Sequence, residues 1–151
     1  MKGKKTKRSQ DYTKTIKIGA ECGKVYSALA TLKGLRGWWT PLVNGKPTTG
    51  GKVRFEFEGL EEYIDMKVER SSDPSAVHWT CLKHTDLPEW DGTKIEFNVT
   101  RKSANSCILN FRHIGLSPKL DCFNDCKLGW DHFLASIVAL VENGKGMPFG
   151  G

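Results

Sequence analysis

The chain's 151 residues are 38% hydrophobic and 26% charged, proportions that exclude an intrinsically disordered chain, and the length suits a single globular domain. The net charge of +6 does not predict a nucleic-acid-binding surface. Five of the 23 basic residues lie in residues 1–8, and the rest of the chain is nearly neutral, with 18 basic and 17 acidic side chains.

Residues 1–10 are polar and basic and are predicted to form a disordered tail before a single domain over residues 11–148. A solubilising role for the tail and binding of nucleic acid, an acidic partner or anionic lipid are equally compatible with its sequence. No apolar segment follows the tail as in a secretory signal, and no apolar run reaches the roughly 20 residues of a membrane span.

The first part of the domain is predicted to be a strand followed by short helices. Tyr12–Ile18 alternates as a strand does. Residues 21–36 have apolar positions three and four apart, which predicts helix, and Gly34 and Gly37 are expected to break it into short pieces. Residues 43–52 are rich in turn-forming residues and are predicted to form a loop.

From residue 53 onward, apolar and polar residues alternate strictly over several short segments. Such alternation predicts strands with one buried and one solvated face, as in an antiparallel sheet that is covered on one side. The expected strands lie around residues 53–57, 64–68, 77–81, 95–99 and 107–113.

The last segment supplies an element that can cover the sheet. Apolar residues recur at helical spacing over residues 124–143, and Gly144 stands where the end of a helix favours glycine. The sequence therefore predicts an α+β fold, in which a curved antiparallel sheet of about six strands wraps around a long C-terminal helix.

The cysteines indicate the redox environment of the protein. The five cysteines include no C-x-x-C pair, and in a chain without an export signal they are expected to be reduced thiols in a cytoplasmic protein. Cys122 and Cys126 are one helical turn apart, but no matching Cys/His pair follows, so neither a metal site nor a cofactor is predicted.

Several short motifs resemble a known family when they are taken in order. The most specific are LRGWWT at residues 35–40 and GWDHFL at residues 129–134, and further matches lie at residues 25–29, 50–51, 77–79, 90–93, 111–116 and 144–148. Together they span about residues 12–148. They resemble the SRPBCC (START-like, Bet v-like) helix-grip superfamily, and within it the homologues of the activator of the heat-shock protein ninety ATPase.

The resemblance implies a helix-grip fold with two short helices after the first strand. It does not fix an activity, because the superfamily includes lipid carriers, hormone receptors, polyketide cyclases and co-chaperone domains.

Alternation and helical spacing direct many large side chains into the space between the sheet and the long helix. They either fill this space as ordinary core or line a pocket for a small hydrophobic or aromatic ligand. The candidate ligand-binding residues are Trp38, Trp39, Phe55, Phe57, Met66, Trp79, Phe97, Phe111, His113, Trp130, Phe133 and Ile137.

Three of these candidates have competing roles. Trp38 and Trp39 would form a stacking wall for a ligand or anchor the short helices, and as adjacent residues at most one of them is expected to line a cavity fully. His113 shares the inward face with Phe111 and would orient a ligand, act as a general base or be a structural histidine.

Three classes of function follow from these features. The first is binding of a small hydrophobic molecule in a cavity between the sheet and the helix. The second is a co-chaperone-like protein-interaction domain, whose partner would be a chaperone ATPase. The third is a cyclase- or hydrolase-type enzyme, for which His113, Tyr26 and Tyr63 are the candidates, although no nucleophile–base pair is visible in the sequence. No catalytic residue is assigned.

Overall fold

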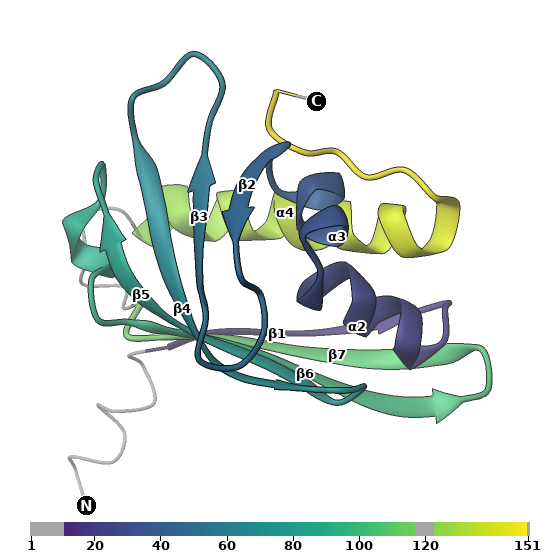
Figure 1. The fold of residues 1–151 in the computed structure, drawn as a ribbon. Coiled ribbons are helices and arrows are strands. Elements are labelled where there is room, and N and C mark those ends of the chain that lie inside the picture. The colour runs from purple at the N-terminus through teal and green to yellow at the C-terminus, as the bar shows by residue number, and fades with distance from the viewer. Residues whose placement is uncertain (1–10, 117–122, 151) are drawn as a thin grey trace, which may run out of the picture.

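In the computed structural model, which describes residues 11–116 and 123–150, an antiparallel sheet of seven strands curves around one long helix (Figure 1). From one edge to the other, the strands are β1 (Asp11–Ile18), β7 (Ser106–Ile114), β6 (Lys94–Ser103), β5 (Ala76–His84), β4 (Tyr63–Ser72), β3 (Lys52–Glu56) and β2 (Leu42–Gly45). The tail predicted over residues 1–10 lies outside the described residues, and so does Cys122.

The helices lie on one side of this sheet. The long helix α4 (Phe123–Asn143) runs along its inner side, and α2 (Cys22–Ala30) and α3 (Leu32–Trp38) lie beside the C-terminal end of α4 (Figure 1). A 3₁₀ turn, η1 (Pro88–Trp90), connects β5 to β6. None of the helices in the described ranges is long and apolar enough to cross a membrane.

The predicted architecture is confirmed, and the periodicity explains it. The inward positions of the strands are buried, as in the alternating pattern of β7. On α4 the apolar residues that face the sheet follow one another at helical spacing, and those that are buried are Cys126, Trp130, Leu134 and Ile137.

The expected count of about six strands is corrected by one strand. Part of the predicted loop over residues 43–52 is β2, which pairs with β3 so that Val43 lies opposite Phe55. Val43 is the one buried residue in this short edge strand. A four-residue strand with a single buried position leaves no periodic signal, so its turn-forming neighbours dominated the prediction.

The position of the break between the short helices also differs from the prediction. Gly34 and Gly37 lie inside α3, and the chain breaks at Thr31, whose extended backbone begins the helix and whose Oγ1 accepts a hydrogen bond from Gly34 N–H. Gly34 has another role, because a Cβ there would lie 2.5 Å from Ala28 Cα and from the Ser27 carbonyl oxygen. Glycine therefore permits the close contact of α2 and α3.

This contact predicts unequal effects of two glycine-to-alanine substitutions. Gly34→Ala should lower the free energy of unfolding by about 1–3 kcal/mol, because the new methyl group meets backbone atoms that cannot move independently. Gly23→Ala in α2 is the matched control. Its Cβ would have 3.6 Å to the Glu21 carboxylate, so its stability should be unchanged or slightly raised. Denaturant unfolding followed by circular dichroism measures both, and equal stabilities of the two variants would contradict the packing argument.

Candidate ligand-binding site

Most of the space between the sheet and α4 is filled by aromatic side chains. Phe55, Trp79, Phe97 and Phe111 form a continuous row with ring centroids 5.7, 5.1 and 5.3 Å apart. Trp38 meets Phe97 edge to face, and its indole N–H donates to the Ala28 carbonyl at 2.7 Å. These rings are packed as in an ordinary protein core.

A pocket of about 240 Å³ lies at one end of this core, beside the N-terminal half of α4. Its volume is just below the roughly 300–1,000 Å³ typical of sites for drug-sized ligands, which suits a smaller molecule. Six of the fourteen lining residues have aromatic side chains: Trp39, Phe57, Trp90, Trp130, Phe133 and Phe149. The remaining lining residues are Leu60, Glu62, Ile64, His84, Leu87, Asp125, Cys126 and Gly129.

Four of the residues that the sequence singled out line this pocket, namely Trp39, Phe57, Trp130 and Phe133. The other eight lie outside its wall, each at most 2% exposed: Trp38, Phe55, Met66, Trp79, Phe97, Phe111, His113 and Ile137. Of the two adjacent tryptophans, Trp39 lines the pocket, and Trp38 is stacked behind it at a centroid distance of 5.5 Å.

His113 fixes the pocket wall from behind. The Trp130 indole N–H donates to His113 Nδ1 at 3.0 Å, so the ring proton is on Nε2, which donates to Thr93 Oγ1 at 2.8 Å. The Thr93 hydroxyl in turn donates to the Trp90 carbonyl at 2.6 Å. Burial lowers the pKa of His113 to about 3, which keeps the ring neutral. His113 thus holds the stacked rings of Trp90 and Trp130, 5.9 Å apart.

The end of β5 and η1 add a second part of the wall that the sequence did not assign to the site. His84 ends β5 and is 5% exposed. Its Nδ1 accepts the backbone N–H groups of Asp86 and Leu87 at 3.3 and 3.0 Å, so its ring proton is on Nε2. Trp90 begins the family motif at residues 90–93. This motif was the one feature of the sequence that could have pointed to Trp90 as a wall residue.

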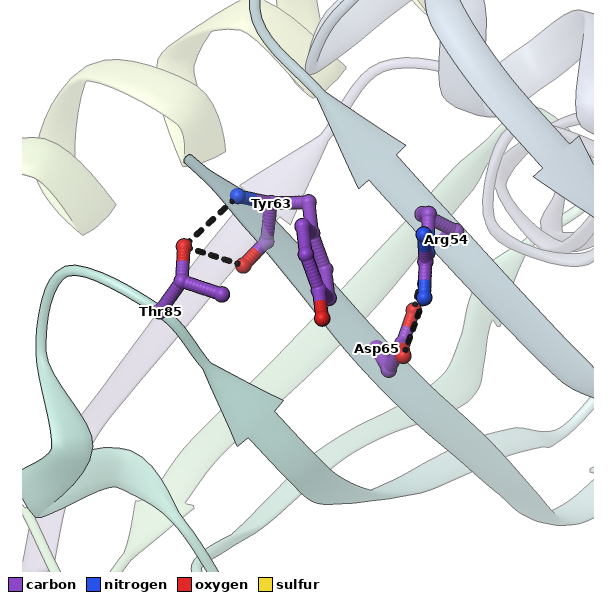
Figure 2. Close-up of polar contacts among 4 residues, drawn as sticks. All are labelled: Arg54, Tyr63, Asp65 and Thr85. Carbon is purple, nitrogen blue, oxygen red and sulfur yellow. Dashed lines mark hydrogen bonds and ion pairs between the residues drawn. The ribbon is translucent and has the colours of Figure 1, made fainter. Parts of the chain in front are cut away.

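Polar contacts anchor the strands that carry the rim of the pocket (Figure 2). Thr85 Oγ1 accepts the backbone N–H of Tyr63 at 2.8 Å and donates to its carbonyl at 3.2 Å. Arg54 donates twice to the Asp65 carboxylate, at 2.8 and 3.0 Å, and its guanidinium lies 3.8 Å from the centroid of the Tyr63 ring. These contacts join β3, β4 and the residue after β5 next to the rim.

The residues that follow α4 close the pocket from another side. Phe149 N–H donates to the Trp39 carbonyl at 2.7 Å, and Met147 N–H donates to Ser136 Oγ at 2.6 Å. The Phe149 ring meets Phe57 edge to face at 5.4 Å. The sequence gave no sign of this contribution, because the segment is aperiodic and its position depends on these hydrogen bonds.

Ionisable groups in the wall have no metal-binding arrangement. Within residues 11–116 and 123–150, no group of three or more His, Cys, Asp or Glu residues could hold a metal ion. Burial, together with the charge of Asp86, raises the pKa of Glu62 above its ordinary value, and burial lowers the pKa of His84. The pocket is therefore suited to binding by apolar contact, with Glu62, Asp125 and His84 as its polar contacts.

No family model matches the sequence, and no curated protein matches it. Several solved structures are similar to it. The Aha1 dimer from Colwellia psychrerythraea is similar over 90% of this chain and 98% of that chain, with 30% sequence identity and a TM-score of 0.77.

Two further structures are similar in fold alone. The protein SSP2350 from Staphylococcus saprophyticus has 14% identity and a TM-score of 0.74, over 91% of this chain and 95% of that one. CalU16 from Micromonospora echinospora has 14% identity and a TM-score of 0.71, over 91% of this chain and 69% of that one.

The neutral state of His113 predicts a pH dependence of stability. Between its folded pKa of about 3 and the ordinary value of about 6.5, the unfolded chain binds a proton that the folded chain does not. Lowering the pH from 7.5 to 5 should therefore remove about 2 kcal/mol of unfolding free energy through this residue.

The variant His113→Asn tests this contribution, because its Oδ1 can still accept the Trp130 indole N–H. It should be less stable than the unmodified protein at pH 7.5 but lose less stability on acidification. Urea unfolding at several pH values measures, for each protein, how the free energy of unfolding changes with pH. His84 is present in both proteins, so an identical change of stability with pH in the two would show that His113 is not held neutral.

Proposed function

Because this chain belongs to the Aha1-like branch of the SRPBCC helix-grip superfamily, we propose that it binds a small hydrophobic or aromatic molecule in the pocket beside α4. The observation that carries the proposal is the aromatic wall, in which six rings surround about 240 Å³. Burial of apolar ligand surface against such a wall contributes about 25 cal/mol per Å² before the costs of ordering are subtracted.

The wall is already held in place, which favours binding. Trp90 and Trp130 are fixed through His113, and Phe149 is fixed by its hydrogen bond to the Trp39 carbonyl. Side chains that are ordered before binding lose little further conformational entropy, so more of the contact energy contributes to affinity.

The enzyme alternative has less support from the candidate residues. Both ring nitrogens of His113 are hydrogen-bonded within the protein, which leaves none to act as a base on a substrate. The Tyr26 hydroxyl is hydrogen-bonded to Ser71, and the Tyr63 ring lies against the Arg54 guanidinium.

Protein–protein binding is a second candidate function, because the similar Colwellia protein is named Aha1 and was solved as a dimer. Large apolar side chains are also exposed on this chain, among them Leu128 of α4 at 66% and Leu60 at 48%. Such side chains are available for contact with a partner such as a chaperone ATPase.

The ligand proposal predicts the effect of a substitution at Gly129. A Cβ at Gly129 would meet no atom within 4 Å, and this residue lines the pocket, so Gly129→Leu should place its side chain in the pocket. We expect at least about tenfold weaker binding of the neutral probe 2-(1-naphthyl)ethanol. Folding should not suffer, because leucine favours helix over glycine by about 0.5–1 kcal/mol.

Isothermal titration calorimetry with the probe measures the affinity, and Gly129→Ala is the matched control that should keep most of it. Native mass spectrometry of freshly purified protein adds a search for a co-purified apolar ligand. A protein that does not bind the probe, or a Gly129→Leu variant that binds it as tightly as the unmodified protein, would overturn the proposal.

The second candidate predicts a different result for the same variant. Titration with a heat-shock ATPase should show saturable binding that Gly129→Leu leaves unchanged and Leu128→Ser weakens, because Leu128 is exposed and lies outside the pocket wall. If no binding is detected, the protein-interaction function is contradicted.

A further inference from the structure

The charged side chains in the pocket wall are acidic, although the chain as a whole is basic. Glu62 and Asp125 line the pocket, and no Lys or Arg is found among its described lining residues. In the part of the chain that the structure describes, neither carboxylate forms an ion pair. Among the described residues, the two negative charges of the pocket wall thus have no opposite charge in direct contact.

Further carboxylates lie in the segments next to Glu62. Glu58 and Glu61 lie in the same turn between β3 and β4 as Glu62, and Asp86 is near enough to raise the pKa of Glu62. His84, the basic side chain in the wall, is held neutral by its lowered pKa and adds no positive charge. The described charged groups of the wall and of these neighbouring segments are therefore acidic, and the free protein bears the cost of keeping a half-buried carboxylate close to other acids.

The aromatic rings add to this preference. The faces of Trp, Tyr and Phe rings carry partial negative charge and attract cations within about 6 Å, most strongly at sites shielded from water. Three tryptophans, Trp39, Trp90 and Trp130, line this pocket together with Phe57, Phe133 and Phe149. Aromatic faces beside uncompensated carboxylates form a site for an apolar group that carries a positive charge.

We propose that the ligand of this pocket is a small organic cation, an amine or quaternary ammonium group on an aromatic or aliphatic body. This inference rests on the proposed ligand-binding function and specifies its substrate class. The apolar body contacts the aromatic wall, and the cationic group lies toward Glu62 and Asp125, where it supplies a positive charge beside the two carboxylates.

Three probes with the same naphthyl group and different charges test the proposal: 2-(1-naphthyl)ethylamine, 2-(1-naphthyl)ethanol and 1-naphthylacetate. Calorimetry at pH 7 should give the tightest binding for the amine, weaker binding for the alcohol and the weakest for the acid. The amine's affinity should also fall as salt is added, because ions screen the carboxylates. The indole N–H resonances of Trp90 and Trp130, observed by NMR, should shift and so locate the binding.

Charge-removing variants assign the effect to the two carboxylates. Glu62→Gln and Asp125→Asn should each weaken binding of the amine by about threefold to tenfold and change the affinity for the neutral alcohol less, so that the ratio of the two affinities falls. Glu21→Gln is the matched control. It removes the same charge beside the groove at the C-terminal end of α4 and should leave all three affinities unchanged.

The outcomes separate this inference from the function on which it rests. If the alcohol binds as tightly as the amine, or if Glu62→Gln and Asp125→Asn do not weaken the amine, the cationic ligand is ruled out while hydrophobic ligand binding stands. If none of the three probes binds, the proposed function itself fails and the cationic ligand fails with it.

Discussion

The hydrogen bond from the Trp130 indole to His113 Nδ1 joins the long helix to the inner face of the sheet. The Trp130 ring lies 4.5 Å from Phe111 in the core and also forms part of the pocket wall. A buried imidazole is tolerated only when both nitrogens have partners, and Thr93 supplies the second. The packing of the core, the position of α4 and the shape of the pocket therefore depend on one chain of hydrogen bonds.

The sequence predicted which residues point inward but not whether they leave space between them. Strict alternation identified Phe55 and Phe97 as inward-facing, and helical spacing did so for Trp130, because both signals depend on the chain's own periodicity. The pocket depends on how rings from separate elements fit together, which no local pattern encodes. Trp90 and Phe149 come from aperiodic segments that are positioned by hydrogen bonds to distant residues, Cys126 and Trp39 respectively, so their place in the wall could not be derived.

Aromatic side chains fill most of the core and so determine where a pocket can lie in this protein. Trp38, Trp79 and Phe97 are buried at the centre of the space that the curved sheet encloses. The pocket therefore lies at the end of the core, where β4, β5, η1 and the N-terminal half of α4 meet. Trp130 and Phe133 belong to a packed helix, which is less free to adjust than a loop, so these rings would limit the size of a molecule that entered the pocket.

The charge of the whole chain gives little guidance to the chemistry of this site. The net charge is +6, yet the charged residues that line the pocket are Glu62 and Asp125. Salt screens charges beyond about 10 Å in solution, whereas partly buried groups are screened much less, so the charges that line the pocket matter more here than the net charge of the chain. The ligand that we propose would therefore meet the local carboxylates and ring faces, and the charge of the described wall residues is opposite in sign to the net charge of the protein.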